Sequence, residues 1–134
     1  MFVSNLVVKK VPHTEFSYEI VEDLIWQGNT DSIRVPSGFV CDFASVPWLF
    51  QRIFPKMGTL SDAPAVLHDW LYVTELFDRK TCDEIFLKAL KERGVPKWKA
   101  YSMYYAVRLG GGFVWDKHDQ ETIKMYRKLG NINT

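Results

Sequence analysis

The spacing of apolar and polar residues changes near residue 45. Before that point three runs, residues 6–11, 16–27 and 32–40, are rich in β-branched and aromatic residues, and the polar sequence QGNTDS separates the last two as a turn. Such runs predict β-strands. Pro36 and Gly38 indicate that the final strand is an edge strand or is kinked, because proline cannot donate a ladder hydrogen bond.

Beyond this point the apolar residues recur at helical spacing. Asp62 is a candidate N-cap of the second predicted helix, with Pro64 in its first turn. Thr81 and Glu84 have the spacing of a capping box near the start of the third. Three glycines, Gly110–Gly112, are expected to end the fourth. The expected helices span residues 48–54, 63–76, about 78–94, 95–109 and 118–130.

The order of these elements, strands first and helices after them, predicts an α+β fold. The chain has 134 residues, which is the usual size of one domain. We therefore expect a single domain over residues 1–134, mainly β over residues 1–40 and mainly α over residues 45–130.

The composition is that of a packed globule, with 47% apolar and 15% aromatic residues. The formal net charge is +1, so electrostatic capture of nucleic acid through Lys97, Lys99, Arg108 and Lys124 is not expected. The basic stretches KALKERGVPKWK and IKMYRK are interpreted as solvated helix faces.

The termini and cysteines suggest neither export nor a disulfide framework. The N-terminal sequence MFVSNLVVKK places its charges after a short apolar run, the reverse of a signal peptide, and no apolar run approaches the ~20 residues of a membrane span. Cys41 and Cys82 are interpreted as small core residues.

Two titratable residues lie on the first long predicted helix, residues 63–76, among residues of core type. The neighbours of His68 and Asp69 at helical spacing include Ala65 and Tyr72, and burying a carboxylate without partners costs several kcal/mol or more. The fold must therefore supply partners for both side chains.

The next helix repeats this anomaly. Asp83 shares one face with Phe86, Leu87 and Leu90. An aspartate there could hydrogen-bond to His68 and fix the tautomer of a general base. The alternative is a structural carboxylate in the first helical turn, favoured by the helix dipole.

Asp42, where the strands end and the helices begin, is either the cap of the following short helix or a calcium ligand together with Asp69. A zinc hydrolase is not expected, because the three histidines form no HExxH motif and no cysteine cluster is present. Ser45 lies in ASVP and not in the GxSxG motif of a serine hydrolase.

Four segments, GFVCDFASVP, AVLHDWLY, CDEIFLKAL and YYAVRLGG, together resemble a family of short uncharacterised proteins of bacteriophages and bacteria. The resemblance covers roughly residues 33–115. It implies a phage or prophage origin, with a location in the host bacterial cytoplasm or in the virion, and it implies no established activity.

The sequence HDWLY is also similar to the HDxxY helix motif of bacterial and fungal phospholipase A(2). This resemblance implies a helical core of that kind, with His68 activating water, Asp83 orienting the imidazole and Tyr72 bonding to that aspartate. It also implies calcium bound by Asp42 and Asp69, and an ester or lipid substrate. The glycine-rich calcium loop and the disulfides of those enzymes are not reproduced.

Two functions therefore compete. One is a calcium-dependent, phospholipase-like ester hydrolase, in which Trp48, Phe50 and Phe54 form either an acyl-binding rim or simply core. The other is a non-enzymatic phage protein, associated with the virion or tail or with other phage or host proteins, whose polar cluster specifies the fold.

Overall fold

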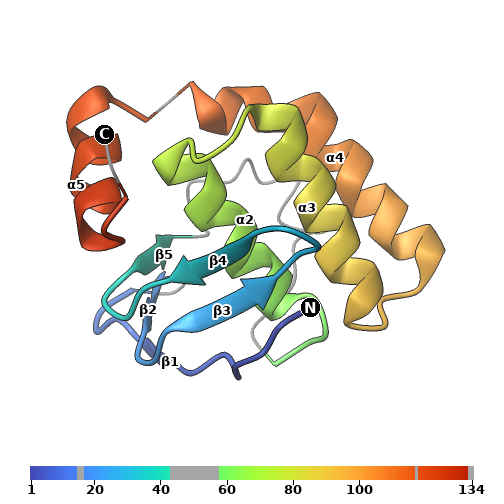
Figure 1. The fold of residues 1–134 in the computed structure, drawn as a ribbon, viewed down its shortest axis with the longest axis horizontal. Helices are drawn as coiled ribbons and strands as arrows, with labels where there is room; N and C mark the ends of the chain where they lie inside the picture. Colours follow the sequence, from blue (N-terminus) through green and yellow to red (C-terminus); the bar gives the residue numbers. More distant parts are fainter. Residues whose placement is uncertain (15–16, 43–57, 117, 133–134) are drawn as a thin grey trace.

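The computed structural model describes residues 1–14, 17–42, 58–116 and 118–132. Within them, short antiparallel strands come first and four helices follow, so the predicted α+β class is confirmed (Figure 1). The predicted helix over residues 48–54, with Trp48, Phe50 and Phe54, lies outside the described residues.

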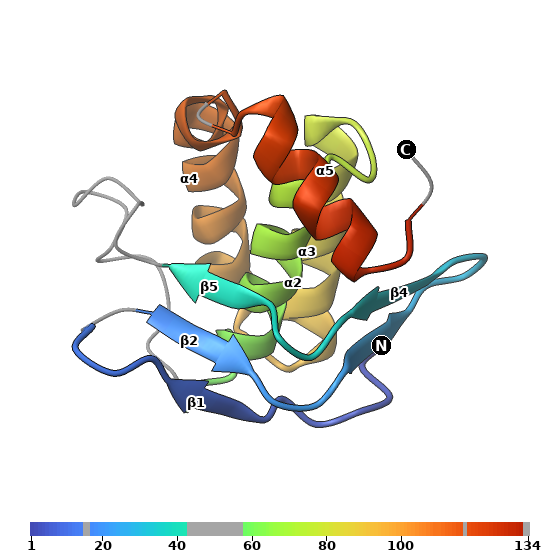
Figure 2. The same cartoon turned by 90° about the vertical axis from the view of Figure 1, so that its left-hand side faces the viewer.

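The strands form two small sheets. Strands β1 (Val8–Lys10), β2 (Ser17–Ile20) and β5 (Val40–Asp42) make one antiparallel sheet in the order β1-β2-β5. Strands β3 (Leu24–Gln27) and β4 (Ser32–Val35) pair as an antiparallel hairpin. The cluster of helices lies above these strands in the view of Figure 2.

Two of the three predicted strands are each divided in the structure. The run 16–27 becomes β2 and β3, and the run 32–40 becomes β4 and the beginning of β5. Gly38 adopts a positive φ of 95° and donates its N–H to the Ile20 carbonyl at 2.8 Å, while the Ile20 N–H donates to the Phe39 carbonyl at 2.8 Å. These bonds turn the chain between the sheets, which agrees with the predicted kink at Pro36 and Gly38 and places β5 at a sheet edge.

Helix α2 (Asp62–Thr74) is the central element of the core. It packs against α3 (Arg79–Glu92) and α5 (Gln120–Leu129), and against strands β3 and β5. All of its residues except Asp62 and Asp69 are buried. A helix that is apolar on nearly every side must be covered on nearly every side, and the helices and sheets around α2 provide that cover.

The helix ends differ from prediction at two places. Asp62 is not the N-cap of α2 but its first residue: Ser61 holds the cap position without a side-chain cap bond, and the Asp62 carboxylate accepts from the Gly58 N–H at 3.1 Å. The start of α3 near residue 78 agrees with prediction: Asp78 is its N-cap and accepts the Thr81 N–H at 3.2 Å, so the alternative start at Thr81 with its capping-box spacing is not adopted.

The second difference is in α4 (Lys97–Trp115), which continues through Gly110–Gly112. The prediction that these glycines end the helix is wrong. A Cβ on Gly111 would lie 2.5 Å from the hydroxyl oxygen of Tyr72 and 3.2 Å from a guanidinium nitrogen of Arg79. The glycine lets the backbone of α4 approach α2 and α3, so it serves helix packing and not helix termination.

The buried apolar residues form two clusters. One unites the sheets with α2 and includes Phe39 and Trp70, whose rings meet edge to face at 5.1 Å between centroids. The other joins Ala65 of α2 to α3 and α4. Its buried members are Ala65, Phe86, Leu90, Val95, Ala100, Met103 and Val107.

Both cysteines are buried free thiols, as predicted for small core residues. Burial raises the pKa of the Cys82 thiol to about 12, so this thiol stays protonated at neutral pH. Among the described helices, none has the length and apolar character needed to cross a membrane.

Replacing Gly111 with alanine is expected to destabilise the protein by about 1–3 kcal/mol, the usual effect of overpacking a tight contact. Gly112 is the matched control, because its nearest contact would be 3.8 Å away. Gly112→Ala is expected to be neutral or to stabilise by up to about 1 kcal/mol, since alanine is the better helix former. Urea unfolding of both variants measures the difference, and equal effects would contradict the close approach at Gly111.

Candidate functional site

The residues predicted from helical spacing meet between α2 and α3. His68 is only 5% exposed and Asp83 is wholly buried. The Nε2 atom of His68 lies 2.7 Å from Oδ1 of Asp83. The predicted pairing of a histidine on one helix with an aspartate on the next is therefore present in the structure.

Tyr72 lies one turn after His68 on α2 and also contacts Asp83. Its hydroxyl donates to the same Oδ1 of Asp83 at 2.6 Å. The ring of His68 packs against the rings of Tyr72 and Phe86, at centroid distances of 4.2 Å and 4.6 Å. The imidazole is thus fixed in place by its ring neighbours as well as by its hydrogen bond.

Two arginines meet the other oxygen of Asp83. Arg108 of α4 donates to Oδ2 at 2.8 Å, and Arg79 lies 3.7 Å from the same atom. Arg79 also donates to the backbone carbonyls of Val107 and Arg108, at 3.2 Å for the closer one. Side chains from three helices therefore converge on one carboxylate.

Neither arginine was predicted from the sequence to contact Asp83. A signal for Arg79 was present, because it precedes Asp83 by four residues, the spacing of an ion pair on a helix. No comparable local signal marks Arg108, which is 25 residues from Asp83 in the chain. Only the general rule that a buried charge needs a partner predicts a cation at this place.

These contacts keep Asp83 ionised. Burial by itself would raise the pKa of Asp83, but the hydrogen bond of His68, the charge of its imidazole when protonated, and then the hydrogen bonds of Tyr72 and Arg108 lower that pKa below its usual value. For Tyr72, burial and the hydrogen bond to Asp83 raise the pKa of the phenol. Tyr72 therefore remains a hydrogen-bond donor at neutral pH.

The ionised carboxylate determines which nitrogen of His68 carries a proton. An ionised carboxylate can only accept hydrogen bonds, so the facing Nε2 must be protonated. When the imidazole is neutral, Nδ1 is then the nitrogen with a free lone pair. This arrangement of His68 and Asp83 is chemically suited to a general base with an orienting aspartate.

Asp69 lies in a different environment from its neighbour His68. Burial, and after it the charge and hydrogen bond of Asp69, raise the pKa of Cys41 in β5. Burial first and then the charge of Asp69 raise the pKa of Tyr126 in α5. Asp69 therefore faces β5 and α5, whereas His68 faces α3.

The predicted calcium pair, Asp42 with Asp69, stays a prediction. The backbone of Asp42 ends β5 opposite Ser17, but its side chain lies outside the described part of the structure. Asp69 is half-buried on α2, close to the strand that ends at Asp42. No group of three acidic, histidine or cysteine side chains suited to a metal ion occurs among the described residues.

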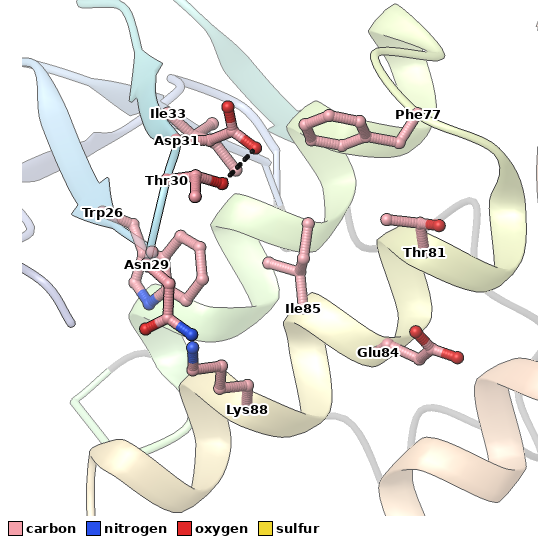
Figure 3. A pocket seen from close by; sticks show the side chains of 11 residues that line it. Trp26, Asn29, Thr30, Asp31, Ile33, Phe77, Thr81, Glu84, Ile85 and Lys88 are labelled. Atoms are coloured by element: carbon pink, nitrogen blue, oxygen red, sulfur yellow. Dashed lines mark hydrogen bonds between the residues drawn. The ribbon is translucent and has the colours of Figure 1, made fainter.

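A separate cavity of about 290 Å³ lies between the turn of the β3–β4 hairpin and α3. Figure 3 shows Ile85 and Lys88 of α3 on one side and Trp26 and Asp31 of the hairpin on the other, with Phe77 at one end. The residues that line it do not include His68, Tyr72, Asp83 or Arg108.

The fold and this site define an α+β protein with a buried His–Asp–Tyr–Arg network shared by three helices. The chain belongs to the DUF1353 family, described as proteins of unknown function, whose profile matches residues 18–107. Membership of this family agrees with the resemblance of the four sequence segments to an uncharacterised family.

A relative in this comparison is the uncharacterized protein y4jT of Sinorhizobium fredii (strain NBRC 101917 / NGR234), 32% identical over 100 residues. The match covers 73% of this chain and 27% of the relative, so the chain spans about a quarter of that protein's length. No solved structure matches the chain significantly.

Replacing Asp83 with asparagine is expected to destabilise the protein by about 1–3 kcal/mol at neutral pH, because a neutral amide replaces the charged acceptor of the hydrogen bonds from Tyr72 and Arg108. The folded state holds the pKa of Asp83 below the ordinary value of 3.8. Its contribution to stability is therefore complete above that value and is lost as the pH falls through the lowered folded pKa.

The measurement is the free energy of unfolding by urea at several pH values. The difference between the wild type and Asp83→Asn should be largest above pH 4, near the 3.8 of an ordinary aspartate, and shrink below it. Asp31→Asn, at an exposed aspartate, is the control and should change stability by no more than about 0.5 kcal/mol. A difference that stays constant into strong acid would contradict an ionised Asp83.

Proposed function

We propose that this protein is an ester hydrolase with a phospholipase A(2)-like centre, in which His68 is the general base and Asp83 orients it. The observation that carries the proposal is the 2.7 Å contact between Nε2 of His68 and Oδ1 of a wholly buried Asp83. The bond from Tyr72 to the same oxygen supports it, because the resemblance of HDWLY to the HDxxY motif implies that bond.

In this proposal Nδ1 of His68 takes a proton from a water molecule while the water oxygen attacks the ester carbonyl carbon. The protonated imidazole then returns the proton to the alcohol oxygen as the ester C–O bond breaks, which yields a carboxylic acid and an alcohol. The negative charge of Asp83 stabilises the imidazolium, and Tyr72 and Arg108 hold Asp83 in place. General-base catalysis of this kind contributes about 10²–10⁴-fold in rate.

The substitution His68→Ala is expected to reduce kcat by about 10²–10⁴-fold, because it removes the base. The assay measures product release from a simple phenyl ester and from phosphatidylglycerol vesicles, with and without millimolar calcium. His118→Ala is the matched control, since His118 is a half-buried histidine outside the network, and it should keep wild-type activity. Equal background release by the wild type and His68→Ala would reject the proposal.

A second proposal is favoured by the two arginines at Asp83. The charge of the Asp83 carboxylate is balanced by Arg108, which donates to it at 2.8 Å, and by Arg79 at 3.7 Å. A fully satisfied buried network of this kind can serve to hold three helices together. In this alternative the protein is a non-enzymatic phage component, and the network specifies the fold. It predicts that Asp83→Asn and His68→Ala lower stability although no hydrolysis is measured, and mass spectrometry of virions would test the role.

A calcium site at Asp69 remains part of the hydrolase proposal, although no step above depends on it. Calcium at about 100 times its Kd would stabilise the folded protein by about 2.7 kcal/mol and so raise its Tm. The Tm of Asp69→Asn should not respond, whereas that of Asp31→Asn should respond like the wild type. An unchanged wild-type Tm at millimolar calcium would rule out the site without affecting the role of His68.

A further inference from the structure

Helix α4 presents apolar side chains on two opposite faces. The inner face packs against α3 through Ala100, Met103 and Val107, all buried. On the outer face Trp98 is 73% exposed, and Leu109 is 88% exposed. Most helices at a protein surface carry polar residues on their outer side, so this face departs from the usual pattern.

The outer residues form one continuous stripe, which we call the α4 stripe: Trp98, Tyr101, Tyr105 and Leu109. They follow one another at intervals of three and four residues, which places them in a row along a helix. At a rise of 1.5 Å per residue the row is roughly 16 Å long. Tyr101 and Tyr105 lie side by side within it, with ring centroids 6.4 Å apart.

The position of α4 leaves this stripe accessible. In Figure 1 α4 is the outermost helix on one side of the molecule, and α3 lies between it and α2. Tyr101 is 39% exposed and Tyr105 is 58% exposed, so both are open to solvent in the folded chain. Contiguous rows of exposed aromatic and aliphatic side chains are typical of interaction surfaces.

The formal charge of the segment that carries the stripe is strongly one-sided. Residues 79–115, which include α3 and α4, carry eight Lys and Arg against three Asp and Glu, a net charge of +5. The rest of the chain carries nine against thirteen, a net charge of −4. The near-zero total charge of the chain therefore includes a positive segment. Arg79 and Arg108 of this segment contact Asp83, and its remaining exposed lysines attract an anionic partner.

Lysines lie directly beside the stripe. Lys97 and Lys99 precede and follow Trp98, so they project to its two sides on the helix, and both are exposed. Lys91 of α3 places its ammonium 5.5 Å from the ring centre of Tyr101. Helix α4 itself contains no acidic residue.

We propose that the α4 stripe binds the surface of an anionic phospholipid bilayer. Trp and Tyr rings favour the level of the lipid headgroups, and Leu109 reaches into the acyl boundary. Lysines beside the rings pair with lipid phosphates. A second copy of the chain is disfavoured as the occupant, because pairing of two α4 stripes would bring two positive surfaces together.

Membrane binding by the α4 stripe does not depend on the hydrolase activity, so each of the two proposals is tested independently of the other. They are nevertheless adjacent in the fold. Leu109 directly follows Arg108, which contacts Asp83. A bilayer at the stripe would therefore lie against the helix that closes the His68–Asp83 network.

The test is sedimentation of the full chain with vesicles of phosphatidylcholine alone and of phosphatidylcholine mixed with phosphatidylglycerol. The wild type is expected to bind the mixed vesicles and to bind neutral vesicles at least tenfold more weakly. Tyr105→Ser combined with Leu109→Ser should weaken binding to mixed vesicles at least tenfold. Lys97→Glu with Lys99→Glu should weaken it by about fivefold or more for each lysine.

The matched controls are on α5, where Met125 is 56% exposed and Lys124 and Lys128 are also exposed. Met125→Ser, and Lys124→Glu with Lys128→Glu, should bind like the wild type, and all variants should keep the wild-type Tm because the changed side chains are exposed. His68→Ala should also bind normally, which separates this test from that of the hydrolase.

Equal binding to neutral and mixed vesicles, or binding unaffected by the stripe substitutions, would overturn the proposal and leave α4 as a face for a protein partner. A wild-type dimer that the substitutions at Tyr105 and Leu109 convert to a monomer would assign the face to a second copy and would also overturn it.

Discussion

The structure depends on one buried charge. Asp83 is inaccessible to solvent, and an ion removed from water is costly unless charged and hydrogen-bonded partners replace the water. Those partners come from three helices: His68 and Tyr72 from α2, Arg79 from α3 itself, and Arg108 from α4. Because each helix must be in position for the carboxylate to be satisfied, the network couples the arrangement of the helices to the geometry of the candidate centre.

The part of this site that follows a helical repeat could be predicted from the sequence. Polar residues at apolar positions mark His68 and Asp83, because each interrupts a face otherwise built for burial. The contact of Arg108 with Asp83 could not be predicted in the same way. Arg108 lies on a different helix, α4, and it reaches Asp83 only because α4 packs against α3. The environment of Asp69 could not be predicted from the sequence either, because it depends on the packing of strand β5 and helix α5 around α2.

The errors in the fold prediction have a common physical cause. Strand composition identified residues 16–27 and 32–40 as extended, but composition does not record where a chain leaves one sheet and enters another. The glycines of α4 were interpreted by their local helix propensity, whereas the role of Gly111 depends on Tyr72, about forty residues earlier in the chain. In both cases a tertiary contact outweighed the local preference.

Gly111 also has a consequence for how the sequence of α4 can vary. Arg108 and Gly111 are three residues apart and so face the same side of the helix, one supplying a charge and the other the absence of a side chain. A single residue inserted or deleted between Met103 and Arg108 would rotate Arg108 and Gly111 by about 100° around the helix axis, relative to the residues of α4 that pack against α3. Asp83 would lose its counter-ion Arg108, and α4 would lose the close approach to Tyr72 that Gly111 allows. Changes of length should therefore be confined to the segments that connect the helices.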